Sequence, residues 1–369
     1  MAEALKESFK INIVASLARR ISIYYPVFDS ESFVEQVDVG FERLELMDRG
    51  RQVSRVLKTH LPVDYATAIK LLVATMDPPP VEFESAGMSV FRYLPISFFI
   101  ADYGLNHFDD SMLAQYELTQ RFTAEFSIRP FLLRYPDETL ARLKQWINDP
   151  NEQVRRLVSE GTRPRLPWAC RLRPFQKDPF PVLELLESLK DDESLYVRRS
   201  VANNLNDIGK DHPDILVETA SRWLKNASHN RKWLVKHALR SAVKRGEMGA
   251  LQVLGFGNSP RIKIKYFNYS PTNPVIGDKL RLELTLTSMD KCDQSLMIDI
   301  RAHFIKKNGK ASPKVFKLKA VELSAGQSVQ LSHSINLKNL STRKHYPGTH
   351  QLDLLVNGQA FILGTFILS

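Results

Sequence analysis

Apolar residues recur at spacings of three and four through roughly residue 249, which is the periodicity of amphipathic helices. Breakers separate the helical segments at Asp77-Pro78-Pro79-Pro80, Asp149-Pro150 and His212-Pro213. After residues 255–260 the pattern changes to strict alternation, as in Leu280–Leu286, which is typical of half-buried strands. The pattern therefore predicts a helical region over residues 1–255 and a β-rich region over residues 256–369.

The alternating runs of the second region number around seven in about 110 residues. Asn308-Gly309 and Asn357-Gly358 lie between such runs, and Asn-Gly is a preferred dipeptide of two-residue hairpin turns. The count favours a two-sheet sandwich of immunoglobulin-like type, although the Cys…Trp…Cys pattern of antibody domains is absent from the sequence.

An internal repeat lies in the helical region. Asp149–Arg156 recurs as Asp192–Arg199, so that Val154 and Val197 are 43 residues apart, and a weaker copy begins at Asn230. This period is typical of HEAT and armadillo repeats, in which stacked helix pairs share one core. We expect the Asp of each copy to cap its helix. The predicted fold class is an N-terminal α-solenoid of HEAT-like repeats plus a C-terminal immunoglobulin-like β-sandwich.

Each repeat helix has a polar face opposite its apolar stripe, and these faces form one surface if the helices stack. We expect that surface on the concave side of the solenoid, with the following residues: Arg156, Glu160, Arg199, Asn203, Asp207, Trp233, His237, Arg240 and Lys244. A solvated face of mixed charge is the alternative interpretation. Cations at matched repeat positions favour contact with a regularly spaced phosphate backbone.

Charge and composition point in the same direction. The 369 residues carry a formal net charge of +10, which favours polyanionic partners such as nucleic acid. Residues 258–369 hold sixteen Lys and Arg against seven Asp and Glu, nearly the whole excess. No apolar run approaches the ~18 residues of a membrane span, and the N-terminus lacks the pattern of a secretion signal. Cys170 and Cys292 are too few for a disulfide framework, which favours a cytoplasmic protein.

The segment after the first repeat helix is unusual. Residues 162–174 contain four Arg, three Pro and an indole, and they follow directly on Glu160-Gly161. The stretch Val154–Trp168, VRRLVSEGTRPRLPW, closely resembles a segment of the AlkC/AlkD family of HEAT-repeat DNA glycosylases. The resemblance to the AlkC branch covers the helical region broadly, and the appended sandwich is similar to one that some AlkC members carry. His237 stands where AlkD proteins have a Trp, so the AlkD pattern does not carry over whole.

The resemblance implies a DNA glycosylase that hydrolyses the N-glycosidic bond of N3-alkylated bases, 3-methyladenine above all and also 3-methylcytosine, in base excision repair. Such a base is a cationic leaving group, and the bond breaks through an oxocarbenium-like sugar. Carboxylates can stabilise that cation and position water, and an indole face can add cation–π attraction of about 0.5–2 kcal/mol. Because such a base is already activated, no base-protonating acid is required. The resemblance also implies that no deep base-flipping pocket is needed, in contrast to most glycosylases.

With this resemblance we expect Glu160, Asp207 and Trp168 to form the reaction centre, and Glu125 to be a further carboxylate. The alternatives are a helix salt bridge of Glu125 with Arg121 or Arg129 and a core position for Trp168. The expected DNA contacts are Arg156, Arg163, Arg165, Arg199, Trp233, Lys236, His237 and Arg240. The expected partner is double-stranded DNA containing alkylated bases, with no membrane and no obligate protein partner, in a bacterial cytoplasm and nucleoid-associated when bound.

No metal or cofactor is expected. The following histidines lack Cys or His partners at ligand spacing: His107, His212, His229, His237 and His345. The sequence also has no GxGxxG, Walker loop or GxSxG motif. A non-catalytic nucleic-acid-binding or scaffolding HEAT-repeat protein is the alternative function. For the sandwich, the basic segments Lys306–Lys310 and Arg343–Tyr346 indicate either a second DNA contact or a solvating surface.

Overall fold

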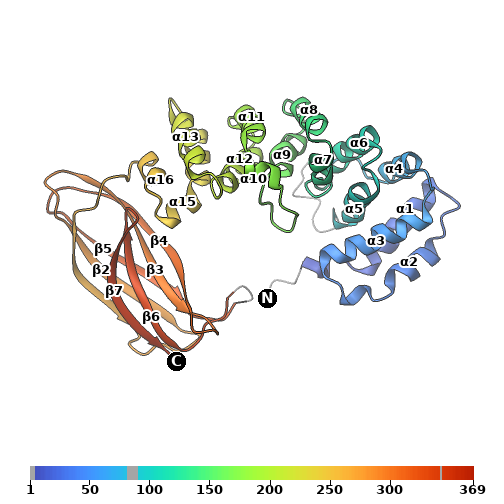
Figure 1. Cartoon of the computed structure of the whole chain (residues 1–369). Coiled ribbons are helices and arrows are strands. Elements are labelled where there is room, and N and C mark those ends of the chain that lie inside the picture. Colours follow the sequence, from blue (N-terminus) through green and yellow to red (C-terminus); the bar gives the residue numbers. More distant parts are fainter. Residues whose placement is uncertain (1–4, 81–89, 341–342) are drawn as a thin grey trace. The chain divides into compact units, whose positions relative to one another are not determined.

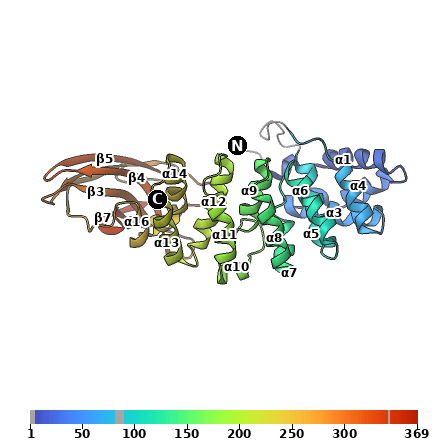
Figure 2. The same ribbon diagram turned by 90° about the horizontal axis from the view of Figure 1, so that it is seen from above.

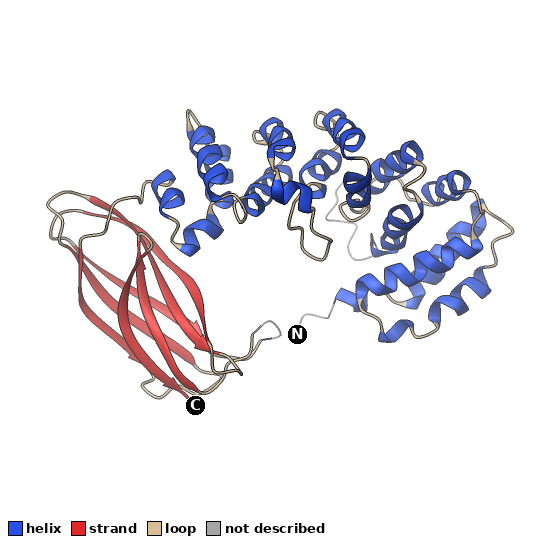
Figure 3. Ribbon diagram, viewed as in Figure 1, coloured by secondary structure: helices blue, strands red, loops and turns tan. Residues whose placement is uncertain are grey.

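The computed structural model describes residues 5–80, 90–340 and 343–369. In these ranges helices come first and strands follow (Figures 1 and 3). The helices are η1 (Leu5–Ser8), α1 (Ile11–Tyr24), α2 (Ser30–Asp38), η2 (Phe41–Arg43), α3 (Leu46–His60), α4 (Tyr65–Ala74), α5 (Leu94–Tyr103), α6 (Phe108–Thr119), α7 (Ile128–Arg134), α8 (Pro136–Trp146), α9 (Glu152–Gly161), α10 (Arg173–Lys177), α11 (Phe180–Leu189), α12 (Leu195–Ile208), α13 (Pro213–Leu224), α14 (His229–Ala238), α15 (Arg240–Arg245) and α16 (Met248–Val253). The strands are β1 (Ile262–Ser270), β2 (Lys279–Ser288), β3 (Gln294–Ile305), β4 (Ala311–Leu323), β5 (Ser328–Asn336), β6 (Gly348–Val356) and β7 (Gln359–Leu368).

Packing divides the chain into two compact units. Unit 1 comprises residues 1–211 and 227–238, and therefore holds α1–α12 and α14. Unit 2 comprises residues 212–226 and 239–369, and therefore groups α13, α15 and α16 with all seven described strands. The change from helix to strand falls between Val253 and Ile262. The division into domains at 255/256 stays a prediction.

In unit 1 the repeat helices stack side by side. Helices α9, α12 and α14 pack next to one another in a row (Figure 2). Helix α8 packs against α9, and α11 packs against both α9 and α12. The predicted apolar stripes form the core between them: Val154, Leu157 and Val158 of α9, Val197, Val201 and Ile208 of α12, and Leu234, Val235 and Ala238 of α14 are all buried. The predicted HEAT-like stacking is confirmed. None of the helices in the described ranges is long and apolar enough to cross a membrane.

The start of each repeat helix differs from the prediction. Asn151 caps α9 and Ser194 caps α12, each accepting a hydrogen bond from a main-chain N–H two residues later. Asp149 and Asp192 lie two residues before these caps and accept the N–H of the cap residue itself, each at 2.8 Å. The predicted Asp caps are therefore wrong, because the extended residue before the first turn is Asn151 or Ser194.

Displaced from the cap, Asp192 joins two successive repeats. The guanidinium of Arg155 donates to both of its carboxylate oxygens, at 2.7 and 3.0 Å. Arg155 also donates to the carbonyls of Asp149 and Pro150, and Arg198 makes the matching pair of bonds one repeat later. The first Arg of each Val-Arg-Arg copy thus holds the turn before its own helix, and Arg155 also links two successive repeats.

The third repeat helix is interrupted. Helix α14 ends at Ala238 and α15 begins at Arg240, because Leu239 has a ψ of −9°, far from the value of a regular helix. Trp233 and His237 therefore lie in unit 1, whereas Arg240 and Lys244 lie in unit 2. The expectation of one unbroken third repeat helix through Lys244 is wrong, and the surface predicted on it stays a prediction.

Unit 2 contains two antiparallel sheets, with strand orders β1-β2-β5 and β4-β3-β6-β7. Inward-facing residues of both sheets form one core, including Leu282, Ile300 and Leu354, all without exposed surface. The Asn357-Gly358 turn joins β6 to β7 with φ values of +47° and +79°, as a type I′ hairpin requires. The predicted immunoglobulin-like sandwich, and with it the predicted fold class, is confirmed.

Candidate active site

Three carboxylates from neighbouring elements of unit 1 are joined by two arginines. Glu125 lies in the turn between α6 and α7, Glu160 in the last turn of α9, and Asp207 near the end of α12. Arg156 pairs with Glu125 at 2.7 Å and with Glu160 at 3.4 Å. Arg163 pairs with Glu160 at 2.7 Å and with Asp207 at 2.8 Å. We call these five residues the carboxylate–arginine chain.

The carboxylates of this chain are largely removed from water. Glu160 is 6% exposed and Asp207 has no exposed surface. Further donors satisfy them: Ser200 Oγ donates to Glu160 at 2.6 Å, and Lys210 Nζ donates to Asp207 at 2.7 Å. Burial alone raises the pKa of Glu160, but the guanidinium groups of Arg156 and Arg163 outweigh it and hold that pKa below its usual value. Glu160 is therefore ionised at neutral pH.

Arg156 is enclosed at the centre of this arrangement. Its guanidinium lies 5.1 Å from the centre of the Tyr196 ring, and its two carboxylate partners lie on α9 and in the α6–α7 turn. Burial lowers the pKa of Arg156, yet Glu125 and Glu160 raise it more, so that the net shift is upward. Burial raises the pKa of the Tyr196 hydroxyl, so this side chain is uncharged at neutral pH. Its neutral ring packs against the Arg156 guanidinium.

Short helical spacings in the sequence explain how the chain assembles. Arg156 and Glu160 are four residues apart on α9, a distance at which side chains on a helix meet. Glu160 and Arg163 are three apart across the end of the same helix. At that end, a Cβ on Gly161 would lie only 2.7 Å from Ile128 Cγ2, so glycine permits the close approach of α7.

The loop after α9 exposes Trp168. Its side chain is 68% exposed, and its φ of +62° lies in the left-handed region that residues with a Cβ rarely adopt. The alternative of a core position for Trp168 is therefore wrong. Arg165, in the same loop, pairs with Asp211 through Nε at 2.8 Å, and Asp211 also accepts a hydrogen bond from Gln176. An exposed indole in a strained conformation is a feature of functional sites more than of packing.

The structure also settles the alternative for Glu125. A helix salt bridge with Arg121 or Arg129 is wrong, because α6 ends at Thr119 and Glu125 lies in a turn. Arg121 pairs with Glu117 instead, and Arg129 donates to main-chain carbonyls. Glu125 thereby meets Arg156, which comes from a different element.

The predicted DNA contacts separate into groups with different surroundings. Arg156 and Arg163 belong to the carboxylate–arginine chain, and Arg165 is paired with Asp211. Arg199 and Lys236 are exposed. The rings of Trp233 and His237 are stacked with centroids 5.2 Å apart, and His237 Nε2 lies 3.2 Å from Asn203 Oδ1. Arg240 lies on α15 in unit 2. DNA contact by these residues stays a prediction.

Three members of the site's surroundings were not predicted from the sequence. Lys210 follows Asp207 by three residues, and this spacing is a usable signal for an ion pair at a helix end. Ser200 and Arg129 carry no such signal, because their partners lie 40 and 32 or more residues away. Only the packing of α12 on α9 and of α7 on the loop reveals them.

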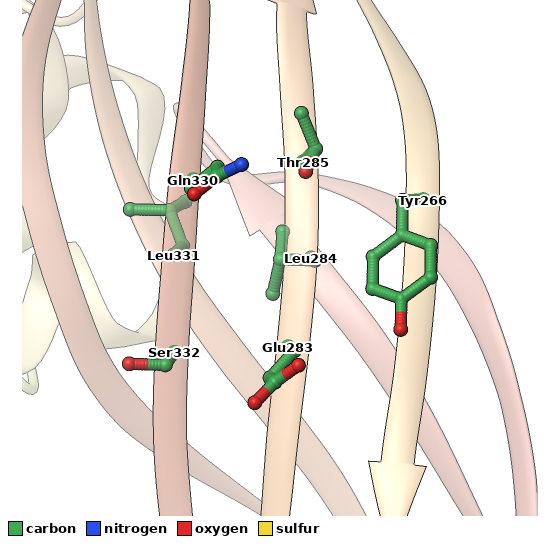
Figure 4. A pocket seen from close by; sticks show the side chains of 7 residues that line it. All are labelled: Tyr266, Glu283, Leu284, Thr285, Gln330, Leu331 and Ser332. Atoms are coloured by element: carbon green, nitrogen blue, oxygen red, sulfur yellow. The ribbon is translucent and has the colours of Figure 1, made fainter.

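A further hollow lies outside the carboxylate–arginine chain, in unit 2. Among the described residues no group of His, Cys, Asp or Glu could hold a metal ion. A hollow on the β1-β2-β5 sheet lies in unit 2, where the strand register sets Tyr266, Thr285 and Gln330 in one row (Figure 4). Glu283 and Ser332 form the next row, and the lining holds no Lys or Arg.

Comparisons with known proteins extend over the whole chain. Residues 263–369 match a family model described as the C-terminal Ig-like domain of the uncharacterised protein YhaZ. The chain is 36% identical over 356 residues to the uncharacterized protein YhaZ of Bacillus subtilis (strain 168), covering 96% of each. It also matches the solved structure of Pseudomonas fluorescens alkylpurine DNA glycosylase AlkC bound to DNA containing an abasic site analog. That match has 38% identity and a TM-score of 0.91 and covers 100% of both chains.

Proposed function

The chain belongs to the AlkC family of HEAT-repeat proteins, and on this premise we propose that it is a DNA glycosylase that excises alkylated bases from double-stranded DNA. The proposed substrates are N3-alkylated, cationic bases, 3-methyladenine above all and also 3-methylcytosine. The observation that carries the proposal is the carboxylate–arginine chain, whose Arg163 lies in the loop that exposes Trp168.

The chemistry of a cationic base suits this arrangement. The glycosidic bond breaks with its electron pair going to the base, which leaves neutral, while positive charge develops on the sugar. Glu160 is held ionised by two arginines, so it can stabilise that charge but has no proton to donate to the base. Since the base is already a good leaving group, no acid is needed. The exposed Trp168 face adds cation–π attraction.

The three carboxylates differ in how far they are buried, and this difference assigns them different roles. The Glu125 side chain is 13% exposed and that of Asp207 only 1%, so a sugar approaching from solvent reaches Glu125 before Asp207. Direct contact with Asp207 requires Arg163 or Lys210 to move away. The positive charge that develops on the sugar competes with the Arg163 guanidinium for the same carboxylate oxygens, and these two cations repel each other. As long as Arg163 stays in place, Asp207 acts by holding it there.

The test is release of free 3-methyladenine from methylated duplex DNA by the full-length protein. We expect release by the wild type and a loss of at least about 100-fold in the Glu160→Gln, Asp207→Asn double variant, since the first change removes the charge that stabilises the sugar and the second releases Arg163. Glu184→Gln is the matched control, because Glu184 belongs to an exposed ion pair with Lys144 on α8. Undiminished release by the double variant would refute the assigned mechanism.

A non-catalytic nucleic-acid-binding or scaffolding role is the second candidate. One observation favours it: each of the three carboxylates already has a cationic partner, so the chain also suits a purely structural cross-link between repeats. Under this alternative the wild type binds DNA and releases no base. Binding and release measured on the same methylated duplex therefore distinguish the two functions.

The sandwich supplies a second DNA contact in this proposal. Lys306, Lys307 and Lys310 are all exposed at the β3–β4 turn, where phosphates can reach them. Replacing the three with Ala should weaken binding and lower its salt dependence. Substitution is preferable to truncation, because α15 and α16 pack with the sheets: a Cβ on Gly358 would lie 2.9 Å from both Gly246 O and Leu251 Cδ1. Unchanged affinity would leave the lysines as a solvating surface.

A further inference from the structure

A buried arginine lies beneath the loop that exposes Trp168. Arg129, in the first turn of α7, has no exposed surface. Its guanidinium donates to the carbonyls of Gly161 at 3.1 Å, Arg163 at 2.8 Å and Cys170 at 2.9 Å, with a second bond to the Cys170 carbonyl. Every acceptor of these Arg129 hydrogen bonds is a main-chain oxygen. Burial lowers the pKa of Arg129, so the carbonyl oxygens must compensate for the loss of water.

The three carbonyls belong to successive parts of one loop. Gly161 is the last residue of α9, Arg163 is the residue that bridges two carboxylates, and Cys170 comes two residues after Trp168. A single guanidinium therefore joins the start of the loop to the part beyond the indole. Within the loop itself, the main-chain bonds are Leu172 N to Pro164 O at 3.2 Å and Ala169 N to Leu166 O at 3.4 Å, both long.

Trp168 needs such an external anchor. Its left-handed φ of +62° brings Cβ close to the following carbonyl, and residues other than Gly, Asn and Asp rarely adopt it. A loop free to relax would leave this conformation and move the indole. The surroundings must therefore impose the conformation. The Arg129 bonds on either side of Trp168 do so from α7, and the Arg165–Asp211 pair does so from the end of α12.

We propose that Arg129 is a positioning residue for base excision, a role that rests on the proposed function. It holds the loop so that Arg163 stays between Glu160 and Asp207 and Trp168 stays displayed toward solvent. The planar fork of an arginine can serve three carbonyls at once, whereas a lysine ammonium is a point charge on a flexible stem. Arg129 thereby couples the geometry of the carboxylates to that of the indole without touching the DNA.

The test compares full-length Arg129→Gln and Arg129→Lys with a matched control, Arg49→Gln. Arg49 is equally buried and also donates to main-chain carbonyls, those of Lys6, Phe9, Leu44 and Glu42, but in the N-terminal part of unit 1. Three quantities are measured: the single-turnover rate of 3-methyladenine release at saturating DNA, the affinity for methylated duplex, and the fluorescence of Trp168. The last is obtained by subtracting the signal of the same variant carrying Trp168→Phe.

We expect Arg129→Gln to lower the single-turnover rate by roughly 10- to 100-fold, because small displacements of positioned groups are costly in rate. Affinity should change by less than about threefold, since Arg129 makes no phosphate contact in this scheme. Arg129→Lys should recover part of the rate. The Trp168 fluorescence should shift in Arg129→Gln and its quenching by acrylamide should change. Arg49→Gln should lose thermal stability with the rate per folded molecule and the Trp168 signal unchanged.

The outcomes separate this proposal from the proposed function. An unchanged rate and an unchanged Trp168 signal in Arg129→Gln overturn the positioning role, as does an equal loss of rate in Arg49→Gln. If Arg129→Gln does not fold, Arg129→Lys decides: wild-type rate and wild-type Trp168 signal in that variant overturn the role. If the wild type releases no base, the proposed function fails. The Trp168 signal still tests the anchor, because it is measured without DNA.

Discussion

Replacing Arg163 by Met removes the one side chain that pairs with both Glu160 and Asp207. Met has a similar length and no charge, so the change leaves two buried carboxylates with fewer partners and little new empty space. Glu160 keeps Arg156 and Ser200, and Asp207 keeps Lys210. Breaking a buried pair by removing one partner costs about 3–5 kcal/mol. We expect the free energy of unfolding at neutral pH to fall by that amount.

The loss should depend on pH in a definite direction. In the wild type the pKa of Glu160 is depressed below its ordinary value of 4.5. Its ionised form therefore stabilises the fold above about pH 4.5, and this stabilisation disappears as the pH falls through the lower pKa of the folded state. Without Arg163, burial raises the pKa of Glu160, and the carboxylate takes up a proton more readily. The deficit of the variant should be largest at neutral pH and smaller at about pH 5.

Urea unfolding followed by the far-UV helical signal measures these differences. Glu160→Gln and the variant that combines Arg163→Met with Glu160→Gln complete a double-mutant cycle. Because a neutral amide does not need Arg163, the double variant should lose about 1–3 kcal/mol less than the sum of the single losses. Lys144→Met is the control: its pair with Glu184 is 54% and 66% exposed, so about 0–1 kcal/mol is expected. Additive losses, or a deficit that grows toward acid pH, would refute the reasoning.

Two further predictions concern the indole and the exposed cations. Trp168→Gly should raise the free energy of unfolding by up to about 1 kcal/mol, because glycine adopts a φ of +62° without strain. The relief of about 1–2 kcal/mol outweighs the roughly 0.5–1 kcal/mol that the greater entropy of glycine in the unfolded chain costs. The same change should slow base release about 2- to 30-fold, which corresponds to the ~0.5–2 kcal/mol of a cation–π contact; faster or equal release would show that the indole is not used. Arg199→Ala and Lys236→Ala should each lower the slope of log affinity against log salt by about 1. Lys144→Ala on α8 should leave that slope unchanged, and three equal slopes would contradict a DNA surface on α12 and α14.

The fold was largely predictable because its signals are local. The alternation in Leu280–Leu286 and the Asn357-Gly358 turn specify strands and a hairpin from adjacent residues. The Val154-to-Val197 period specifies stacked helix pairs in the same way. The break at Leu239 escaped prediction, because the apolar period continues through Leu239 and Ala242, both buried, and carries no breaker residue. The helix caps were predicted wrongly for a related reason. Each helix is preceded by two polar residues close together, an Asp and then Asn151 or Ser194, and only the backbone angles decide which of them caps.

The site was predictable only as far as helical spacing reaches. Arg156 and Glu160 were correctly placed on one face, four residues apart. Periodicity, however, does not tell an exposed polar face from one covered by the next helix. Glu160 and Asp207 were expected on an open surface and instead are buried among cations. Glu125 reaches the same cluster from a turn 31 residues before Arg156, and Arg129 holds a loop that ends more than 40 residues away. Pairings at these separations depend on the packing of whole helices.

The burial of the carboxylates and their arginine partners are two parts of one physical requirement. A carboxylate stabilises a nearby cation most strongly where water is excluded, but exclusion of water also drives it to take up a proton and lose its charge. Arg156 and Arg163 resolve this conflict for Glu160, because they keep its pKa low despite its burial. The arginines nevertheless occupy the oxygens that the sugar cation of the proposed mechanism would need. In the proposed mechanism the positive charge moves from the base to the sugar only in the transition state. The sugar can then displace part of the arginine–carboxylate interaction without a change in the total charge of protein and substrate. The arginine partners that favour a structural role for the chain are thus also what a buried, ionised and cation-stabilising carboxylate requires.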